Sequence, residues 1–455
     1  MLLKFLREGR GEGEDLLDYT LNYGADTGNV VGVPYVWMGL TGGFQGSYAT
    51  APFYLKVREY NFVENRDFWI YPLNLDADQL RLLVAHAWEI RDVPFPYFFL
   101  HRNCAFYLLE FLELARPGAG LTSHFPFWTV PLDTIRLLQR EGLAGTPRFR
   151  ASRYRRLVAA RDSLQPTERS LAEALAESGD TPLPRGREAA ILDAAYELWR
   201  YRNESKSSAN PEIERLLLDQ RAQYAERAAP APAATDRPES GHPTSRAYVG
   251  GGRNRLRGFV EVGYRGTLHD LLADPAGYED FSELSMGDLR LRLEAGSLFL
   301  ERFDLLRLRA IAPREPWIPR WSWSFRAGFE RAREFTCEGW GCSAGNFEGG
   351  YGVAAKLGPV NGFVLLEGGM DAGRPFERGY RLGIGPSGGI YAPLWPGARA
   401  LLEGTWRWRG AGSETARRSA RAGFAQTISR AWEARLTGES ARGYREALAQ
   451  ANFYF

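Results

Sequence analysis

One cysteine stands where the sequence could support thiol chemistry. Cys104 follows an aromatic run and a polar segment, Phe95-Pro96-Tyr97-Phe98-Phe99-Leu100 and then His101, Arg102 and Asn103. The apolar residues after it recur at helical spacing, namely Leu108, Leu109, Phe111 and Leu112. Cys104 is therefore predicted to lie at a helix N-terminus, where free amides and the helix dipole favour a thiolate. Because the thiolate is the attacking species in thiol enzymes, Cys104 is a candidate nucleophile.

Neighbouring polar residues are candidates for supporting roles. Asn103, or the amides at the helix start, could stabilise an oxyanion, and Arg102 adds a cation beside the thiol. His101 lies three residues before Cys104, and His86 lies on a preceding predicted helix. Both histidines are interpreted as structural or supporting residues rather than as the base. The alternative for Cys104 itself is a buried structural cysteine, since free cysteines are often buried.

Composition excludes several classes of function. The 57 Lys and Arg residues balance 55 Asp and Glu residues, which gives no argument for a nucleic-acid partner. The glycine-rich stretch 40–48 lacks the spacing of a phosphate-binding loop, and no cofactor is predicted. Cys337 and Cys342 fit a small disulfide loop, which would indicate an oxidising compartment; two free thiols or half a metal site are the alternatives. No further Cys/His pair has zinc-like spacing, so no metal site is predicted.

The pattern divides the chain into four parts. Residues 1–134 predict a small α+β domain, with strands at 17–23, 53–60 and 66–71 and a helix after Asp76. That helix carries an apolar stripe of Leu80, Leu83, Val84 and Trp88. Residues 135–227 form a charged helical segment, and residues 228–245 form a Pro/Ala-rich linker. Residues 246–455 change to a period of two.

The last part predicts an antiparallel transmembrane β-barrel of about ten to twelve strands. Large apolar residues alternate with polar ones, as in Trp321, Trp323 and Phe325 against Ser322, Ser324 and Arg326. Segments of about ten residues are separated by turns, and the chain ends on a strand with Phe455, which resembles the C-terminal signature of bacterial outer-membrane barrels. This prediction is favoured over a soluble sandwich.

The first 135 residues resemble the periplasmic domain of the Lnb-type lipoprotein N-acyltransferases. The matching stretches are 17–23, 39–46, 57–61, 64–71, 86–90 and 103–104. The resemblance implies a permuted papain-like thiol domain in which Cys104 is the nucleophile. The family's histidine stands in a Gly-His segment ahead of a strand like 2–6, so we expect that this sequence is truncated at its N-terminus. A second element, Tyr264-Arg265 with His269-Asp270-Leu271-Leu272, resembles the start of the family's β-rich region.

Two functions from different classes follow. The first is a periplasmic thiol acyltransferase or amidase anchored in the outer membrane, for which the resemblance implies a phospholipid donor and a lipoprotein acceptor. A peptidoglycan or peptide amide hydrolase would use the same residues. The second is a non-enzymatic barrel whose periplasmic domain is a binding or scaffold module. Both place the chain in the bacterial outer membrane, with membrane lipid as a partner.

Overall fold

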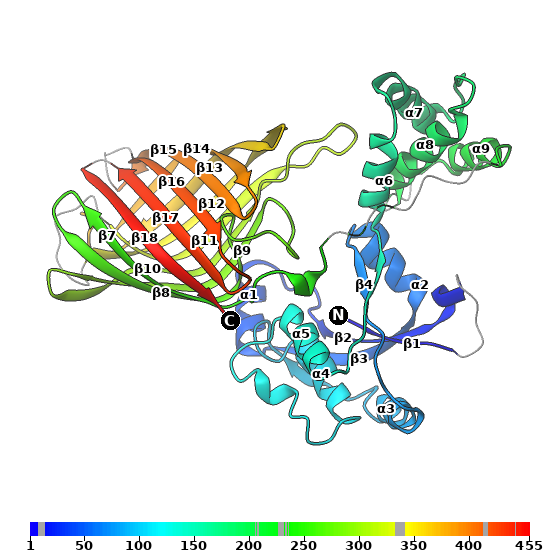
Figure 1. The fold of residues 1–455 in the computed structure, drawn as a ribbon, viewed down its shortest axis with the longest axis horizontal. Helices are drawn as coiled ribbons and strands as arrows, with labels where there is room; N and C mark the ends of the chain where they lie inside the picture. Colours follow the sequence, from blue (N-terminus) through cyan, green and yellow to red (C-terminus); the bar gives the residue numbers. More distant parts are fainter. Residues whose placement is uncertain are drawn as a thin grey trace. The chain divides into compact units, whose positions relative to one another are not determined.

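The computed structural model describes the chain except for residues 8–13, 205, 207–208, 226–231, 233, 235, 333–341, 413–416 and 442. It consists of two compact units, Met1–Thr235 and Asp236–Phe455. Figure 1 shows the mixed helices and strands of the first unit and the barrel of the second.

A four-stranded antiparallel sheet forms the centre of the first unit. Its order is β1-β2-β3-β5, with bounds Leu3–Phe5, Tyr19–Asp26, Phe44–Pro52 and Phe95–Tyr97. Helix α1 (Gly32–Thr41) connects β2 to β3, and a short 3-10 turn (Glu14–Leu17) precedes β2. Helix α4 (Cys104–Glu113) buries nearly every side chain against this sheet. The predicted α+β character of this part is confirmed.

Helices α3 (Ala77–Glu89) and α5 (Pro131–Arg140) flank α4. Asp76 caps α3 as predicted, because its carboxylate accepts from the amides of Asp78 and Gln79. The predicted apolar stripe packs only in part. Leu83 is buried, but the rest of the stripe is exposed, namely Leu80, Val84 and Trp88.

The predicted strand at 53–60 is wrong. The chain there forms α2 (Phe53–Lys56) and then a π-helical turn, Val57–Val63. A short mixed run of aromatic and charged residues does not distinguish a strand from a helix by periodicity, and here Phe53 and Val57, four residues apart, are the buried apolar residues. The prediction at 66–71 holds for β4 (Phe68–Ile70), which pairs with β6 (Arg148–Arg150).

Four helices complete the first unit. They are α6 (Arg153–Asp162), α7 (Pro166–Ser178), α8 (Glu188–Asn203) and α9 (Pro211–Arg221). Helix α8 contributes the core of this group, since Ile191, Leu192 and Leu198 are buried. A 3-10 turn (Thr122–His124) follows α4. Within the described ranges, none of the helices is both long enough and apolar enough to span a membrane.

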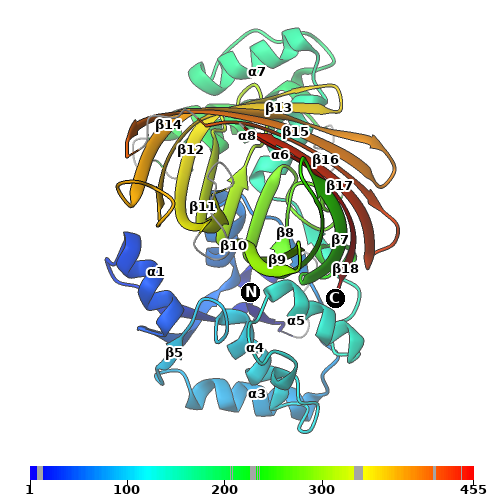
Figure 2. The same cartoon turned by 90° about the vertical axis from the view of Figure 1, so that its left-hand side faces the viewer.

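The second unit is a closed barrel of twelve antiparallel strands after a short 3-10 turn, Pro238–Ser240. The strands are β7 (Arg246–Asn254), β8 (Gly258–His269), β9 (Ser282–Glu294), β10 (Ser297–Ala310), β11 (Ser322–Arg331), β12 (Ser343–Leu357), β13 (Val360–Ala372), β14 (Tyr380–Trp395), β15 (Ala398–Ala411), β16 (Arg417–Thr427), β17 (Trp432–Ala441) and β18 (Tyr444–Tyr454). The last strand pairs with the first, so the barrel has no free edge. Figure 2 shows the curved wall from another side.

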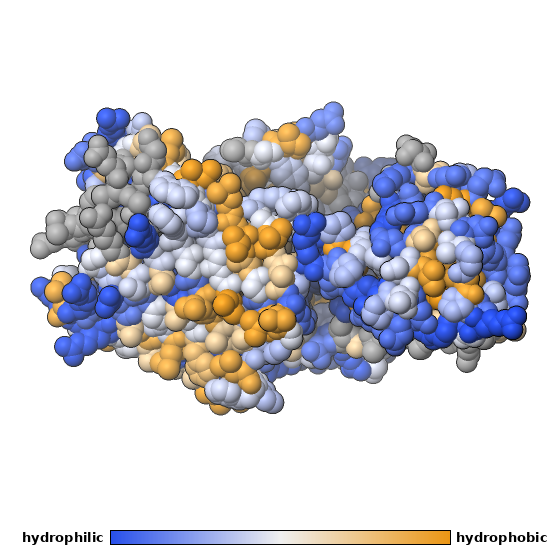
Figure 3. All heavy atoms as spheres, turned by 90° about the horizontal axis from the view of Figure 1, so that it is seen from above, coloured by the Kyte–Doolittle hydropathy of each residue, from blue (hydrophilic) through white to orange (hydrophobic). Residues whose placement is uncertain are grey.

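The two faces of the barrel wall have opposite chemistry. Apolar side chains point outward, as Leu402, Trp406 and Trp408 do on β15. Figure 3 shows apolar residues over part of this outer surface. The alternating residues point into the lumen and include many charged side chains, such as Arg407. An apolar exterior on a closed barrel is the arrangement of outer-membrane strands, which confirms the predicted barrel.

Candidate functional site

Helix α4 begins at Cys104, as the sequence predicted. Asn103 has extended backbone angles and caps the helix: its Oδ1 accepts from the amides of Ala105 at 3.0 Å and Phe106 at 3.3 Å. An Asn at this position satisfies amides that would otherwise lack partners in the first turn. The thiol of Cys104 is free and partly exposed. The nucleophile candidate therefore sits at the positive end of a well-defined helix.

Asn103 also ties two loops to the start of α4. Its Nδ2 donates to the carbonyl oxygen of Thr129 at 2.7 Å and to that of Phe99 at 3.3 Å. Both hydrogens of the Asn103 side-chain amide and its oxygen Oδ1 therefore form hydrogen bonds within the protein. Asn103 therefore has no hydrogen left for a substrate oxygen, and its geometry favours a positioning role over the oxyanion role considered from the sequence.

Tyr97, at the end of β5, is the side chain that the structure adds to the site. Its hydroxyl lies close enough to Cys104 for the charge of the sulfur to act on it. Burial, and then the charge of Cys104, raises the pKa of the Tyr97 hydroxyl above its usual range. The hydroxyl therefore stays protonated at neutral pH and can donate to the sulfur or to an oxygen bound there. The sequence places Tyr97 in the aromatic run, but only the fold brings it to the thiol.

A set of tyrosine hydrogen bonds fixes α4 against the sheet. The Tyr107 hydroxyl donates to the Pro96 carbonyl at 2.9 Å, and the Tyr48 hydroxyl donates to the Tyr107 carbonyl at 2.7 Å. The Tyr23 hydroxyl donates to the Phe95 carbonyl at 3.0 Å. These bonds hold β5, and with it Tyr97, in a constant position relative to the first turn of α4. A site supported in this way keeps its geometry before a substrate arrives.

The two histidines singled out in the sequence pack against aromatic rings of α4. His86 stacks on Phe111, with ring centroids 5.8 Å apart, and its Nδ1 lies 3.2 Å from Glu89. Phe111 is seven residues along α4 from Cys104, which is about 10 Å of helix rise. His101 packs edge-on against Phe106 at 5.4 Å between ring centroids. In the described part of the chain, no histidine is hydrogen-bonded to the Cys104 thiol.

Arg102 lies on the exposed side of the same turn. Its guanidinium carbon is 5.8 Å from the centre of the Phe106 ring, and it interacts with Tyr107 and Glu110. Burial raises the pKa of Glu110, and Arg102 opposes that rise. Arg102 thus brings a positive charge to the rim of the site rather than to the sulfur.

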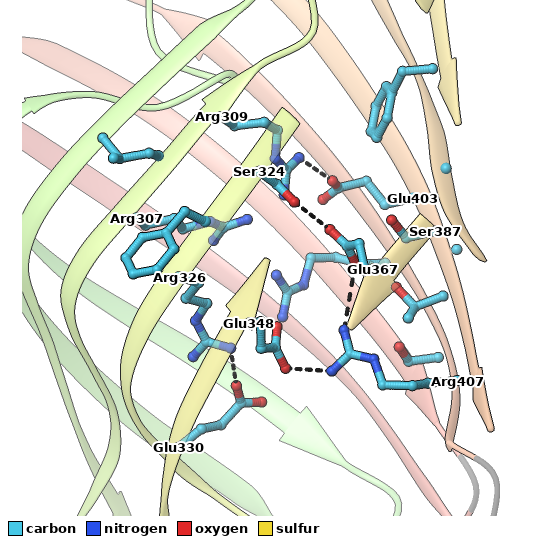
Figure 4. A pocket seen from close by; sticks show the side chains of 18 of the residues that line it. Arg307, Arg309, Ser324, Arg326, Glu330, Glu348, Glu367, Ser387, Glu403 and Arg407 are labelled. Carbon is cyan, nitrogen blue, oxygen red and sulfur yellow. Dashed lines mark hydrogen bonds and ion pairs between the residues drawn. The ribbon is translucent and has the colours of Figure 1, made fainter. Parts of the chain in front are cut away.

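The barrel lumen holds a second cluster of charged side chains, shown in Figure 4. A cavity of about 110 Å³ lies among them. Arg407 pairs with Glu348 at 2.7 Å, Arg326 pairs with Asp304 at 2.6 Å, and Arg309 pairs with Glu403. Because each of these arginines is matched by a carboxylate, the cluster is a lattice of ion pairs rather than a field of one sign.

A loop closes the end of the barrel at which the chain enters and leaves. Leu271 and Leu272, from the loop between β8 and β9, pack with Ile311 against lumen-facing side chains of the wall: Phe363, Leu365, Tyr391 and Leu401. The Leu272 carbonyl accepts from Arg399 Nε at 2.9 Å, and the Ile311 carbonyl accepts from Asn361 Nδ2 at 2.9 Å. We call Leu271, Leu272 and Ile311 the lumen plug.

The plug is anchored by Asp270, which precedes it. Three arginines surround its carboxylate: Arg246 at 2.7 Å, Arg265 at 2.6 Å and Arg435 at 3.1 Å. The element Tyr264-Arg265 with residues 269–272, singled out in the sequence, is therefore the anchor and the body of the plug. Of the two other cysteines, Cys342 is disulfide-bonded, and Cys337 lies outside the described residues.

Comparisons with protein-family models found a match for each of two parts of the chain. Residues 1–141 match the model of the Lnb N-terminal periplasmic domain, which confirms the resemblance found in the sequence. Residues 235–454 match a domain of unknown function, DUF7840. A search of curated proteins found no match.

Similar solved structures are outer-membrane proteins. They include the KdgM porin, with 8% identity over 46% of this chain and 99% of the porin and a TM-score of 0.29. The NanC porin has 5% identity over 46% and 100% of the two chains and a TM-score of 0.31. OmpT of Vibrio cholerae has 6% identity over 46% of this chain and 98% of OmpT, with a TM-score of 0.25. Scores this low support no inference about what the barrel does.

Proposed function

This chain joins an Lnb N-terminal periplasmic domain to a twelve-stranded outer-membrane barrel, and we propose that it is a membrane-anchored thiol acyltransferase. The observation that carries the proposal is a free thiol at the N-terminus of α4 with a protonated tyrosine hydroxyl beside it. Cys104 would supply the attacking sulfur, and Tyr97 can donate to the oxyanion that forms when this sulfur attacks a carbonyl.

The reaction has two steps that share one thioester. In the first, the Cys104 sulfur attacks an ester carbonyl of a phospholipid; the C–O bond breaks, and the released alcohol takes up the proton that the thiol gave up. In the second, an amine attacks the thioester, and the sulfur leaves and regains a proton as the amide forms. The resemblance implies that the amine is a lipoprotein N-terminus. With water in place of the amine, the same site is a hydrolase.

One observation favours a second candidate function. His86 stacks on Phe111 and His101 packs against Phe106, and among the described residues no histidine is hydrogen-bonded to the Cys104 thiol. A thiol without a base fits a periplasmic scaffold module on a membrane anchor. The two functions differ in whether Cys104 is more reactive than an ordinary thiol.

The test uses the full chain in vesicles that contain a phospholipid with a labelled acyl chain. We expect the label to appear on the peptide that contains Cys104, and to move to a diacylglyceryl peptide with a free amino terminus when that is added. Cys104→Ala should lose both signals, whereas Cys104→Ser tests whether an oxygen ester can form. Transfer that survives Cys104→Ala would refute the proposal. An unlabelled Cys104 with an ordinary alkylation profile against pH would support the scaffold.

A further inference from the structure

Exposed apolar side chains lie on three segments that are hydrogen-bonded to one another near the start of α4. Helix α1 presents Val36, Trp37 and Leu40 to solvent, with 68% of Trp37 exposed. Leu100 is exposed in the loop just before Cys104, and Phe127 is 75% exposed in the loop after α4. We call these five residues the apolar rim. Side chains of this size are seldom left exposed together unless they meet a partner.

Hydrogen bonds join the three segments of the rim to the first turn of α4. The Phe99 amide donates to the Gly39 carbonyl of α1 at 2.8 Å, and the Thr129 amide donates to the Leu100 carbonyl at 2.7 Å. Asn103 then bonds the carbonyls of both Phe99 and Thr129. The rim is therefore built around the residue that precedes the thiol.

The contact between α1 and this loop is close. A Cβ atom at Gly39 would lie 2.2 Å from the Phe99 ring, and one at Gly42 would lie 2.3 Å from the Phe98 ring. Gly42 also has a positive φ of 80°, which ends α1. The absence of side chains at these two glycines lets the Phe98 and Phe99 rings approach the helix backbone closely.

The short chain segment between α9 and β7 favours membrane lipid as the partner of the apolar rim. Helix α9 ends at Arg221 and β7 begins at Arg246, so about 25 residues, at most about 90 Å of chain, separate the domain from a barrel embedded in the membrane. The periplasmic leaflet is thus present at high effective concentration throughout the life of the protein. Tryptophan favours the interface between water and lipid, and the exposed Arg102 beside the rim complements lipid phosphates.

We propose that the apolar rim docks into the periplasmic leaflet of the membrane that holds the barrel. The occupant is phospholipid, and the rim seats the first turn of α4 at the leaflet surface. Resting on the proposed function, this docking would let an acyl ester reach the Cys104 sulfur without leaving the bilayer. The docking itself needs only the exposed side chains and the tether.

The test places a fluorescent label at Trp37 or, as a matched control, at Trp88. Trp88 is 70% exposed and belongs to another helix, α3, whose exposed apolar residues make it the competing surface. Each label is attached to a cysteine introduced at that position, Trp37→Cys or Trp88→Cys, in full chains that carry Cys104→Ala. The chains are inserted into vesicles of phosphatidylethanolamine and phosphatidylglycerol. Quenching is measured with spin-labelled lipid and with aqueous iodide.

We expect the label at position 37 to be quenched several-fold more by spin-labelled lipid than the label at position 88, and to be shielded from iodide. Equal quenching at both positions, or stronger lipid quenching at 88, would overturn the proposal. In the otherwise unsubstituted chain, Trp37→Glu should lower acyl transfer from vesicles, and Trp88→Glu should not. Docking without any transfer would refute the proposed function alone, whereas Cys104-dependent transfer without docking would refute the rim alone.

Discussion

Replacing Asn103 with alanine should loosen the start of α4 by an amount that follows from its bonds. The substitution removes the two bonds accepted from the amides of Ala105 and Phe106, and loss of such a cap costs about 1 kcal/mol. It also removes the donors to two carbonyls, which adds about 1–2 kcal/mol because partly buried acceptors lose their partners. The local opening free energy should fall by about 2–3 kcal/mol, or about 30- to 150-fold in the opening equilibrium.

Hydrogen exchange of the peptide that covers the first turn of α4, measured in the full chain, reports this opening directly. Asn103→Asp keeps the acceptor but loses both donors, so its effect should lie between those of the wild type and alanine. Asn210→Ala is the matched control, because Asn210 caps α9 with a single bond to Glu212 and should cost only about 1 kcal/mol, confined to α9. If Asn103→Ala speeds exchange in α4 by no more than Asn210→Ala speeds exchange in α9, the bonds from Asn103 to the carbonyls of Phe99 and Thr129 contribute nothing.

Three further predictions concern the barrel and the helical segment. In planar bilayers the chain should pass little current, because the lumen plug and the ion pairs fill the interior; a steady current of open-pore size would contradict this. Asp270→Asn should lower barrel stability by about 3 kcal/mol or more, seen as heat-induced loss of the folded band on gels, because three buried arginines lose their shared partner; Asp274→Asn, 3.6 Å from its arginine, should have little effect. A hydrogen bond from Arg187 lowers the pKa of Glu168 to about 2, below its unfolded value, so stability that α7 has above about pH 4.5 should be lost as the pH falls towards 2. Hydrogen exchange across residues 165–178, corrected for intrinsic rate, should show this loss, and Glu168→Gln should remove the pH dependence.

Local patterns in the sequence predict much of this fold. Alternation on β11 and β15 identified the outward face, and the apolar run after Asn103 placed the start of α4. Both are properties of neighbouring residues. The length of residues 246–455 predicted about ten to twelve strands. The structure has twelve, and the pairing of β18 with β7 closes them into a barrel.

What the sequence could not predict depends on contacts between distant residues. Tyr97 reaches Cys104 only because β5 pairs with β3, some fifty residues earlier in the chain. On α3, the spacing of Leu80, Val84 and Trp88 reveals a stripe but not how far it is buried, and all three side chains remain exposed. The lumen plug similarly looks like an ordinary loop until the barrel encloses it.

The ion pairs of the lumen have a consequence for how the barrel is made. Several of them join strands that are far apart in the chain: Arg292 on β9 pairs with Glu446 on β18, and Arg435 on β17 pairs with Asp270. A chain that has inserted only its first strands therefore lacks part of this network, although Arg292 already has Glu261 of β8 at 2.7 Å and Asp270 already has Arg246 and Arg265. The pairs with Glu446 and Arg435 form only when the last strands are in place and β18 pairs with β7. The ion pairs of the lumen thus link the stability of the first strands of the barrel to the presence of the last ones.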